Sequence, residues 1–195
     1  MKKPEKALTR TKNGPRIPVQ RMVMIAVFSA ISIVLVALLH VPLFPAAPFL
    51  EYDMADVPII IVTFLYGPLA GLFTTVIVSV LQGLTVSAGS GFIGILMHIF
   101  ATGCYVLVAG NLYKRHRSLG GEIASLGCGT AAMVAVMTLW NMLLTPLFMK
   151  APFEQAMQLM LPAIIPFNLI KAGGNSLIAY FVFKAIEQVM KRRRA

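Results

Sequence analysis

Residues 57–86 read VPIIIVTFLYGPLAGLFTTVIVSVLQGLTV, a stretch of 30 positions without a charged side chain. As a single helix it would be about 45 Å long, whereas the hydrocarbon core of a bilayer is about 30 Å thick. Gly67-Pro68 lies inside the stretch, and proline cannot continue the hydrogen bonding of a helix interior. The stretch therefore encodes either one long kinked membrane span or two short spans that meet at Gly67-Pro68.

The composition assigns the chain to a membrane. Of its 195 residues, 58% are hydrophobic and 12% are charged, and the mean hydropathy is +0.81. The net charge of +10 does not indicate nucleic-acid binding, because Lys and Arg cluster beside apolar segments, in residues 1–21, 114–117 and 191–194. Such clusters are typical of the cytoplasmic ends of membrane spans.

The three basic clusters decide between one span and two. All three belong in the cytoplasm, which requires an even number of spans between the first cluster and the second. Two spans in residues 57–86 satisfy this condition. The first of them, residues 57–66, is too short to cross a bilayer alone and must be covered by protein.

We therefore expect an all-α integral membrane protein with six transmembrane helices and both termini in the cytoplasm. Residues 22–190 would form a single membrane domain between a basic N-tail, residues 1–21, and a basic C-tail, residues 191–195. The lid loop, residues 41–56, would lie on the outer side. The remaining spans are expected at residues 22–40, 92–112, 123–145 and 161–183, with further outer loops at 87–91 and 146–160.

Lys171 lies near the middle of the last predicted span. A charge at bilayer depth costs roughly 3 kcal/mol on insertion scales, so an intramembrane ionisable residue indicates a functional site by default. Asn168, Lys171 and Asn175 fall at positions i, i+3 and i+7 and share one helix face. This face is predicted to line a site for a polar or mixed ligand.

Other polar residues belong to the same outer half of the membrane. Asn141 and Gln82 lie near the outer ends of their spans, and Asp53 and Asp56 lie where the lid loop meets span 57–66. This distribution favours an outward-opening polar cavity over a pore lined along its whole length. Amide side chains also join helices for about 1 kcal/mol or less, so a purely structural role remains an alternative for each of them.

No catalytic or metal-binding pattern is present in the sequence. We find no Ser-His-Asp arrangement, no HExxH motif, no Walker A motif and no cluster with metal-ligand spacing. We therefore expect no enzyme activity, and any active uptake must draw on a partner or an ion gradient. His98 is alone on an apolar span, which favours a structural hydrogen bond.

Small residues mark the inner half of the first span. Ala26 and Ala30 form an AxxxA motif with Ser29 beside them, and small residues four apart let helices approach closely. Packing within the bundle is the simpler explanation of this motif, and docking of a partner helix is the alternative.

Several motifs resemble those of one transporter family. They are AxxxA at residues 26–30, PFLEYDMADVP at 48–58, YGPLAG at 66–71, WN at 140–141 with TP at 145–146, and PFNLIK at 166–171. The chain resembles the substrate-binding S-components of energy-coupling factor (ECF) vitamin transporters. The YDMAD and PFNLIK segments are similar to those of the riboflavin-specific RibU group.

The resemblance implies a function and a set of partners. It implies a six-helix protein of a prokaryotic plasma membrane that binds riboflavin as its transported ligand and needs no cofactor. The AxxxA face would dock on a transmembrane coupling subunit that carries two ATPases. The implied ligand-binding residues, to which we add Gln82 for its depth, are Phe49, Leu50, Tyr52, Asp53, Asn141, Asn168 and Lys171.

Two alternatives remain open on the sequence. The first is an S-component for another vitamin, although the single Trp argues against the aromatic site expected for thiamine. The second is a stand-alone proton-coupled carrier in which Lys171 and Asp56 form the proton-linked pair.

Overall fold

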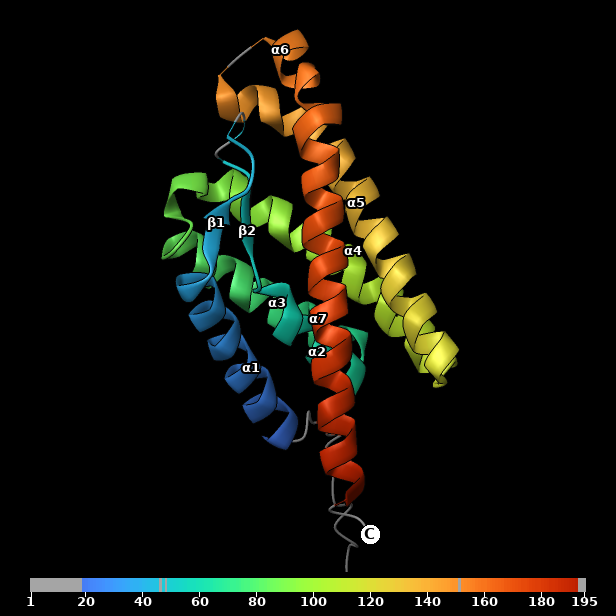
Figure 1. Ribbon diagram of the computed structural model, residues 1–195. Helices are drawn as coiled ribbons and strands as arrows, with labels where there is room; N and C mark the ends of the chain where they lie inside the picture. The colour runs from blue at the N-terminus through green and yellow to red at the C-terminus, as the bar shows by residue number, and fades with distance from the viewer. Residues whose placement is uncertain (1–18, 46, 48, 151, 193–195) are drawn as a thin grey trace, which may run out of the picture.

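A computed structural model describes residues 19–192 except 46, 48 and 151. Residues 1–18 and 193–195 of the predicted tails lie outside the described residues. Four long helices run through the molecule: α1 (Val19–Leu38), α4 (Gly91–Arg115), α5 (Leu119–Met149) and α7 (Ile165–Arg192). Together with their flanking turns they are long and apolar enough to cross a membrane. Figure 1 shows α7 along the whole length of the molecule, with α5 on one side and α1 on the other.

Two shorter helices replace the uninterrupted stretch at residues 57–86. They are α2 (Asp56–Tyr66) and α3 (Pro68–Leu84), and they confirm the predicted break. Gly67 joins them with a φ of +95°, a conformation that L side chains rarely adopt, and Pro68 opens α3 at a position where its missing N–H is not needed. The predicted break thus has a backbone cause.

The short helix α2 lies in the middle of the bundle, as its length requires. It packs on α1, α3, α4 and α7, and its residues from Asp56 to Phe64 are all buried. The main hydrophobic core is built around it, with Ile59, Ile60 and Phe64 among its members. A helix too short to span the bilayer is thus shielded from lipid by its neighbours.

Close packing between α2 and α3 depends on a second glycine. A Cβ at Gly71 would overlap Thr63 Oγ1 and lie 3.0 Å from Thr63 Cβ, while the Thr63 hydroxyl donates to the Ile59 carbonyl at 2.8 Å. The YGPLAG motif therefore makes a turn at its first glycine and a close helix contact at its second.

Substitution Gly71→Ala should destabilise the protein by about 1–3 kcal/mol, because the new methyl group must displace Thr63 in a packed core. Thermal unfolding in detergent measures the change. The matched control is Gly127→Ala on an exposed position of α5, where nothing lies within 4 Å of the new Cβ. Equal stability of the two variants would contradict the close contact.

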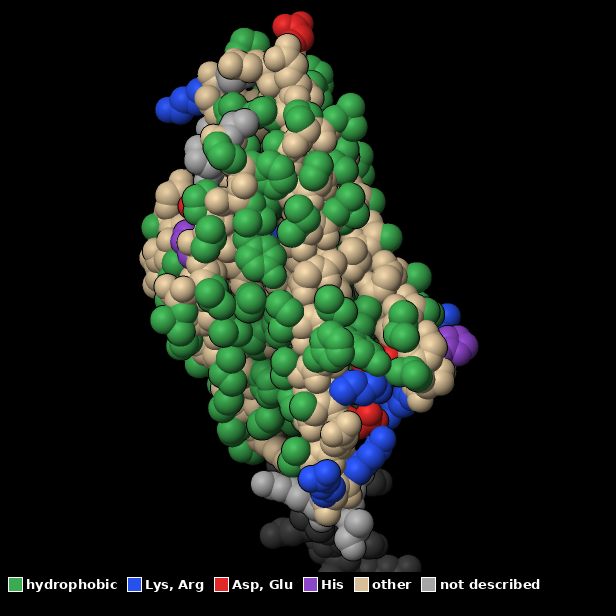
Figure 2. All heavy atoms as spheres, viewed as in Figure 1, with side chains coloured by type: hydrophobic (Ala, Val, Ile, Leu, Met, Phe, Trp, Pro, Cys, Tyr) green, Lys and Arg blue, Asp and Glu red, His purple; other side chains and the backbone are tan. Residues whose placement is uncertain are grey.

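The two ends of the molecule differ in charge. The start of α1, the α4–α5 turn and the end of α7 lie at the lower end in Figure 1, and Lys and Arg side chains gather there in Figure 2. The basic residues at this end include Arg21, Lys114, Arg115, Arg117, Lys191 and Arg192. We call it the inner end and the opposite one the outer end, following the positive-inside rule. The predicted six-helix topology with both termini on one side is confirmed.

The outer end contains more regular structure than the sequence suggested. The lid loop forms an antiparallel hairpin of β1 (His40–Pro42) and β2 (Glu51–Asp53), with His40 opposite Asp53. A short 3-10 turn, η1 (Ala88–Ser90), precedes α4. His40 Nε2 lies 2.6 Å from Glu51 Oε2 across the hairpin.

The predicted outer loop at residues 146–160 is largely helical, which corrects that boundary. Helix α5 continues through Pro146 to Met149, because a proline near the last turn removes only one of its hydrogen bonds. Lys150 ends it with a φ of +51°. A short helix α6 (Phe153–Gln158) and the π-helical turn η2 (Met160–Ile164) then lead into α7.

The surface between the two ends is apolar. Large hydrophobic side chains are exposed on several helices, and Figure 2 shows them over the middle of the molecule. They include Val34, Phe73, Leu143, Leu177 and Phe181. Such a surface is stable in contact with lipid and not with water, so the chain is a membrane protein.

Candidate functional site

A cavity of about 160 Å³ lies in the outer half, between the lid loop and helices α3, α4, α5 and α7. The predicted ligand-binding residues that line it are Phe49, Leu50, Asp53, Gln82, Asn141, Asn168 and Lys171. Its further lining includes Ser79, His98, Met133, Met137 and Phe167. These predicted residues come from four separate segments of the chain and meet around one space.

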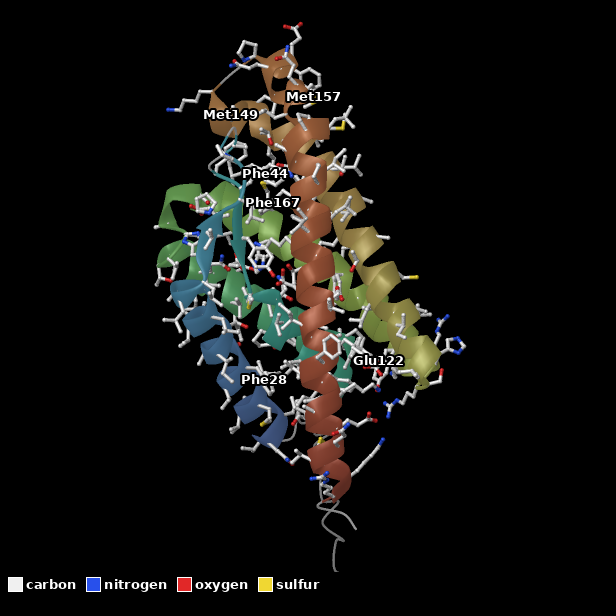
Figure 3. All side chains as sticks on the ribbon, in the orientation of Figure 1. Phe28, Phe44, Glu122, Met149, Met157 and Phe167 are labelled. Atoms are coloured by element: carbon white, nitrogen blue, oxygen red, sulfur yellow. The ribbon has the colours of Figure 1, made fainter. Side chains whose placement is uncertain are left out.

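An apolar cluster closes the outer side of this space. Leu50 packs with Ile164 and Phe167, and Phe44 meets Phe167 edge-on at 6.5 Å between ring centroids. Figure 3 shows Phe44 and Phe167 next to one another above the middle of the molecule. The lid loop is thus attached to the outer end of α7 by hydrophobic contacts.

Asp53 connects the lid loop to the cavity. Its Oδ2 accepts from Lys171 Nζ at 2.7 Å and from Gln82 Nε2 at 3.4 Å, and its Oδ1 accepts from the Ala55 N–H at 3.0 Å. The side chains of Lys171 and Asp53 are 13% and 3% exposed. The buried lysine therefore has the partner that its depth in the membrane requires.

A second buried carboxylate lies at the start of α2. Asp56 accepts from Thr102 Oγ1 at 2.8 Å, from Asn175 Nδ2 at 3.2 Å and from His98 Nε2 at 3.1 Å. The other His98 nitrogen lies 2.7 Å from Ser79 Oγ. A carboxylate at a helix N-terminus is favoured by the helix dipole. His98 joins three helices through these contacts, in agreement with its structural interpretation, and its ring also lines the cavity.

Tyr52 is a correction to the predicted site. Successive residues of a strand point to opposite faces, so Glu51 and Asp53 line the cavity and Tyr52 lies on the other face of β2. Its hydroxyl donates to Asn175 Oδ1 at 3.1 Å. Burial raises the pKa of the Tyr52 phenol above its ordinary value. Tyr52 holds the lid loop to α7 and does not line the cavity.

Asn175 has a role that the sequence only partly indicated. Besides accepting from Tyr52, it donates to the Asp53 carbonyl at 3.1 Å and to Asp56 Oδ2. It therefore ties β2 and the start of α2 to α7. Helical spacing grouped Asn175 with Asn168 and Lys171, and its greater depth explains why it holds the lid loop instead.

The amides of the cavity present acceptors. Asn141 Nδ2 donates to the Met137 carbonyl at 2.7 Å, and Asn168 Nδ2 donates to the Ile164 carbonyl at 2.8 Å. A carbonyl oxygen accepts only, so the amide nitrogen of each side chain must face its own helix. The side-chain oxygens then point away from these backbone carbonyls. Asn141 Oδ1 accepts from Thr145 Oγ1 at 3.0 Å.

The partners of the buried ionisable side chains bear on the carrier alternative. Lys171 is paired with Asp53 and Asp56 with His98, so the Lys171–Asp56 pair expected for a proton-coupled carrier is not formed. Among the described residues, no three His, Cys, Asp or Glu side chains are grouped so that they could hold a metal ion.

The structure corrects one of the three residues predicted for the AxxxA docking face. Ala26 and Ala30 are exposed on α1, whereas Ser29 is 2% exposed and donates to the Ile25 carbonyl of its own helix at 2.8 Å. Ser29 points into the bundle because successive residues of a helix are about 100° apart, which turns position 29 from the exposed face of the two alanines toward the neighbouring helices. The surface available to a partner is therefore formed by the alanines and their exposed apolar neighbours, among them Val23 and Val27.

One charged pair at the inner end was missed by the sequence analysis. Glu122, labelled in Figure 3, is 1% exposed in the first turn of α5, and its Oε2 lies 2.5 Å from Lys184 Nζ of α7. The sequence placed Glu122 just before the span at 123–145, where an acid is ordinary. Only the approach of α5 to α7 shows that it is buried and paired.

Comparisons with known proteins agree with the fold. The family of ECF transporter substrate-specific components matches residues 20–183. The chain is 32% identical to the riboflavin transporter FmnP of Bacillus subtilis, over 91% of this chain and 97% of that protein. It is 30% identical to the riboflavin transporter RibU of Staphylococcus aureus, over 89% and 93%.

A solved structure of the S component of a bacterial ECF transporter is also similar. It superimposes with a TM-score of 0.76 at 29% identity, and the match covers 89% of this chain and 98% of that one. The family match over residues 20–183 contains all six predicted spans and the lid loop. The chain therefore belongs to the family of substrate-specific components of ECF transporters.

Proposed function

We propose that this protein is the riboflavin-binding subunit of an ECF transporter and that the outer cavity is its riboflavin site. The observation that carries the proposal is the convergence of Asn141, Asn168 and Lys171 with the lid loop on one buried space. The names of the two full-length relatives, both riboflavin transporters, support the same ligand.

The chemistry of the cavity suits a flavin. The isoalloxazine ring has a flat apolar body and a pyrimidine edge that alternates carbonyl and N–H groups. Phe49, Leu50, Met137 and Phe167 offer apolar contact for the body, while the side-chain amides and the Lys171 ammonium offer acceptors and donors for the edge or the ribityl hydroxyls.

The size of the cavity assigns a task to the lid loop. An apolar cavity of about 150 Å³ holds a single benzene ring, and this one measures about 160 Å³. A three-ring flavin therefore needs more room. We expect the lid loop to give this room, because its two strands pair with each other and side-chain contacts at Asp53, Tyr52 and Leu50 join it to the helices, so it can shift without breaking a helix.

Family membership implies an ECF module as partner. We propose that the module supplies a transmembrane coupling subunit and two ATPases, and that Ala26 and Ala30 form the docking face on α1 in a prokaryotic plasma membrane. Two small residues four apart would let a coupling helix approach the α1 backbone closely.

Uptake of labelled riboflavin by cells tests this assignment. Expression of the protein together with an ECF module should give uptake that stops when ATP is depleted. Cells with the protein but without the module should show none above background. Uptake without the module that collapses with the proton gradient would contradict the proposal and favour the carrier.

Substitution Asn168→Ala should weaken riboflavin binding about 5- to 150-fold, because a polar group of the bound flavin loses its partner, at about 1–3 kcal/mol. Titration of flavin fluorescence measures the affinity. Asn111→Ala is a matched control, since Asn111 makes the same bond to the carbonyl four residues earlier on an exposed part of α4. Equal affinities of the two variants would remove Asn168 from the site.

A further inference from the structure

Gln82 has a buried acceptor without a partner. Its Oε1 is buried and receives no hydrogen bond from any described residue. Gln82 is 9% exposed and lines the outer cavity. An unsatisfied buried acceptor is costly, so an isolated one next to a binding cavity indicates that a ligand donates there.

The orientation of the Gln82 amide follows from its neighbours. Nε2 donates to Asp53 Oδ2 at 3.4 Å and to Ser87 Oγ at 3.2 Å. Asp53 is ion-paired with Lys171, and an ionised carboxylate accepts only. The nitrogen must therefore face Asp53, both of its N–H groups are used, and the oxygen is left as the atom without a partner.

The same carboxylate oxygen also holds Lys171. Asp53 Oδ2 receives Lys171 Nζ at 2.7 Å, so one atom of the lid loop fixes a donor and an acceptor side by side. A primary ammonium has three N–H donors, which leaves two for a ligand. A donor beside an acceptor is the complement of a carbonyl beside an N–H, the pattern along the edge of a cyclic imide.

We propose that Gln82 is a specificity-determining residue that accepts a hydrogen bond from the imide N–H of the flavin ring, and that Asp53 is the positioning residue that sets the direction of the Gln82 amide. This inference rests on the proposed function, because it assumes that the ligand is a flavin. It adds a requirement: the ligand must present a donor at Gln82.

The test compares riboflavin with N3-methylriboflavin, in which a methyl group replaces the imide hydrogen. In the unaltered protein the methyl analogue should bind at least about 10-fold more weakly. In Gln82→Leu riboflavin should lose about 5- to 100-fold in affinity, and the ratio between the two ligands should fall toward one, because the acceptor is gone. Asp53→Asn should also lower this ratio, since its side chain no longer fixes the amide.

The ratio of affinities separates a recognition role from a merely structural one, because a distorted cavity weakens both ligands alike and leaves the ratio unchanged. The control Thr85→Val, on an exposed residue at the end of the same helix, should change neither affinity. An unchanged ratio in Gln82→Leu would overturn the inference.

Lumiflavin, which keeps the ring N–H and lacks the ribityl hydroxyls, provides the last comparison. Its affinity should still depend on Gln82. If Gln82→Leu leaves lumiflavin binding unchanged and weakens only riboflavin, Gln82 contacts the ribityl chain and the imide assignment is wrong. A failure of the unaltered protein to bind riboflavin at all would instead contradict the proposed function.

Discussion

Substitution Lys171→Met is expected to lower the stability of the protein by about 3 kcal/mol and to weaken riboflavin binding at the same time. The stability falls because Asp53, 3% exposed, is left as a buried carboxylate without its cation. The affinity falls because the cavity loses its ammonium donor. Thermal unfolding in detergent and flavin titration measure the two effects separately.

A double variant distinguishes these effects. Lys171→Met combined with Asp53→Leu removes both charges, so stability should return toward that of the unaltered protein while riboflavin binding stays weak. Lys191→Met is the control at the inner end, where an exposed lysine pairs with Glu187 at 3.3 Å and contributes at most about 1 kcal/mol. A Lys171→Met variant as stable as this control would contradict the buried pair.

Substitutions Ala26→Trp and Ala30→Trp are expected to abolish riboflavin uptake and to leave riboflavin binding unchanged. Both alanines are exposed on α1 in the inner half, away from the cavity, so a large side chain disturbs neither the core nor the site. It would prevent a coupling helix from approaching α1 closely. Uptake in cells with an ECF module and titration of the purified variants measure the two properties.

The matched control is Val34→Trp, which places the same side chain on an exposed position in the outer half of α1. Uptake should be retained in this variant. If the alanine variants transport riboflavin as well as Val34→Trp does, the docking face lies elsewhere on the protein. If they also lose binding, the substitutions act on the fold and not on docking.

The helices and their orientation could be predicted because few physical rules determine them. Hydropathy located the spans, Gly67-Pro68 located the break, and the basic clusters at both ends and at residues 114–117 fixed the parity. The outer loop predicted at 146–160 is largely helical, because Pro146 lies near the last turn of α5, where it removes only one hydrogen bond.

The site residues could be grouped by depth, and their pairing could not be predicted. Lys171 was recognised by the cost of its charge, but the choice of Asp53 over Asp56 as its partner depends on how the hairpin of the lid loop places residues 51–53. The same hairpin turns Tyr52 away from the cavity. The pairing register of β1 with β2 decides which of these side chains face the cavity. The spacing of residues along the sequence does not determine that register.

Riboflavin binding by the purified protein tests the central claim most directly. The protein in detergent is titrated with riboflavin, and quenching of the flavin fluorescence is followed. The structure and its relatives predict a yellow complex with one riboflavin per chain and an affinity tighter than micromolar. A colourless protein that leaves flavin fluorescence unchanged at micromolar concentrations would contradict the account.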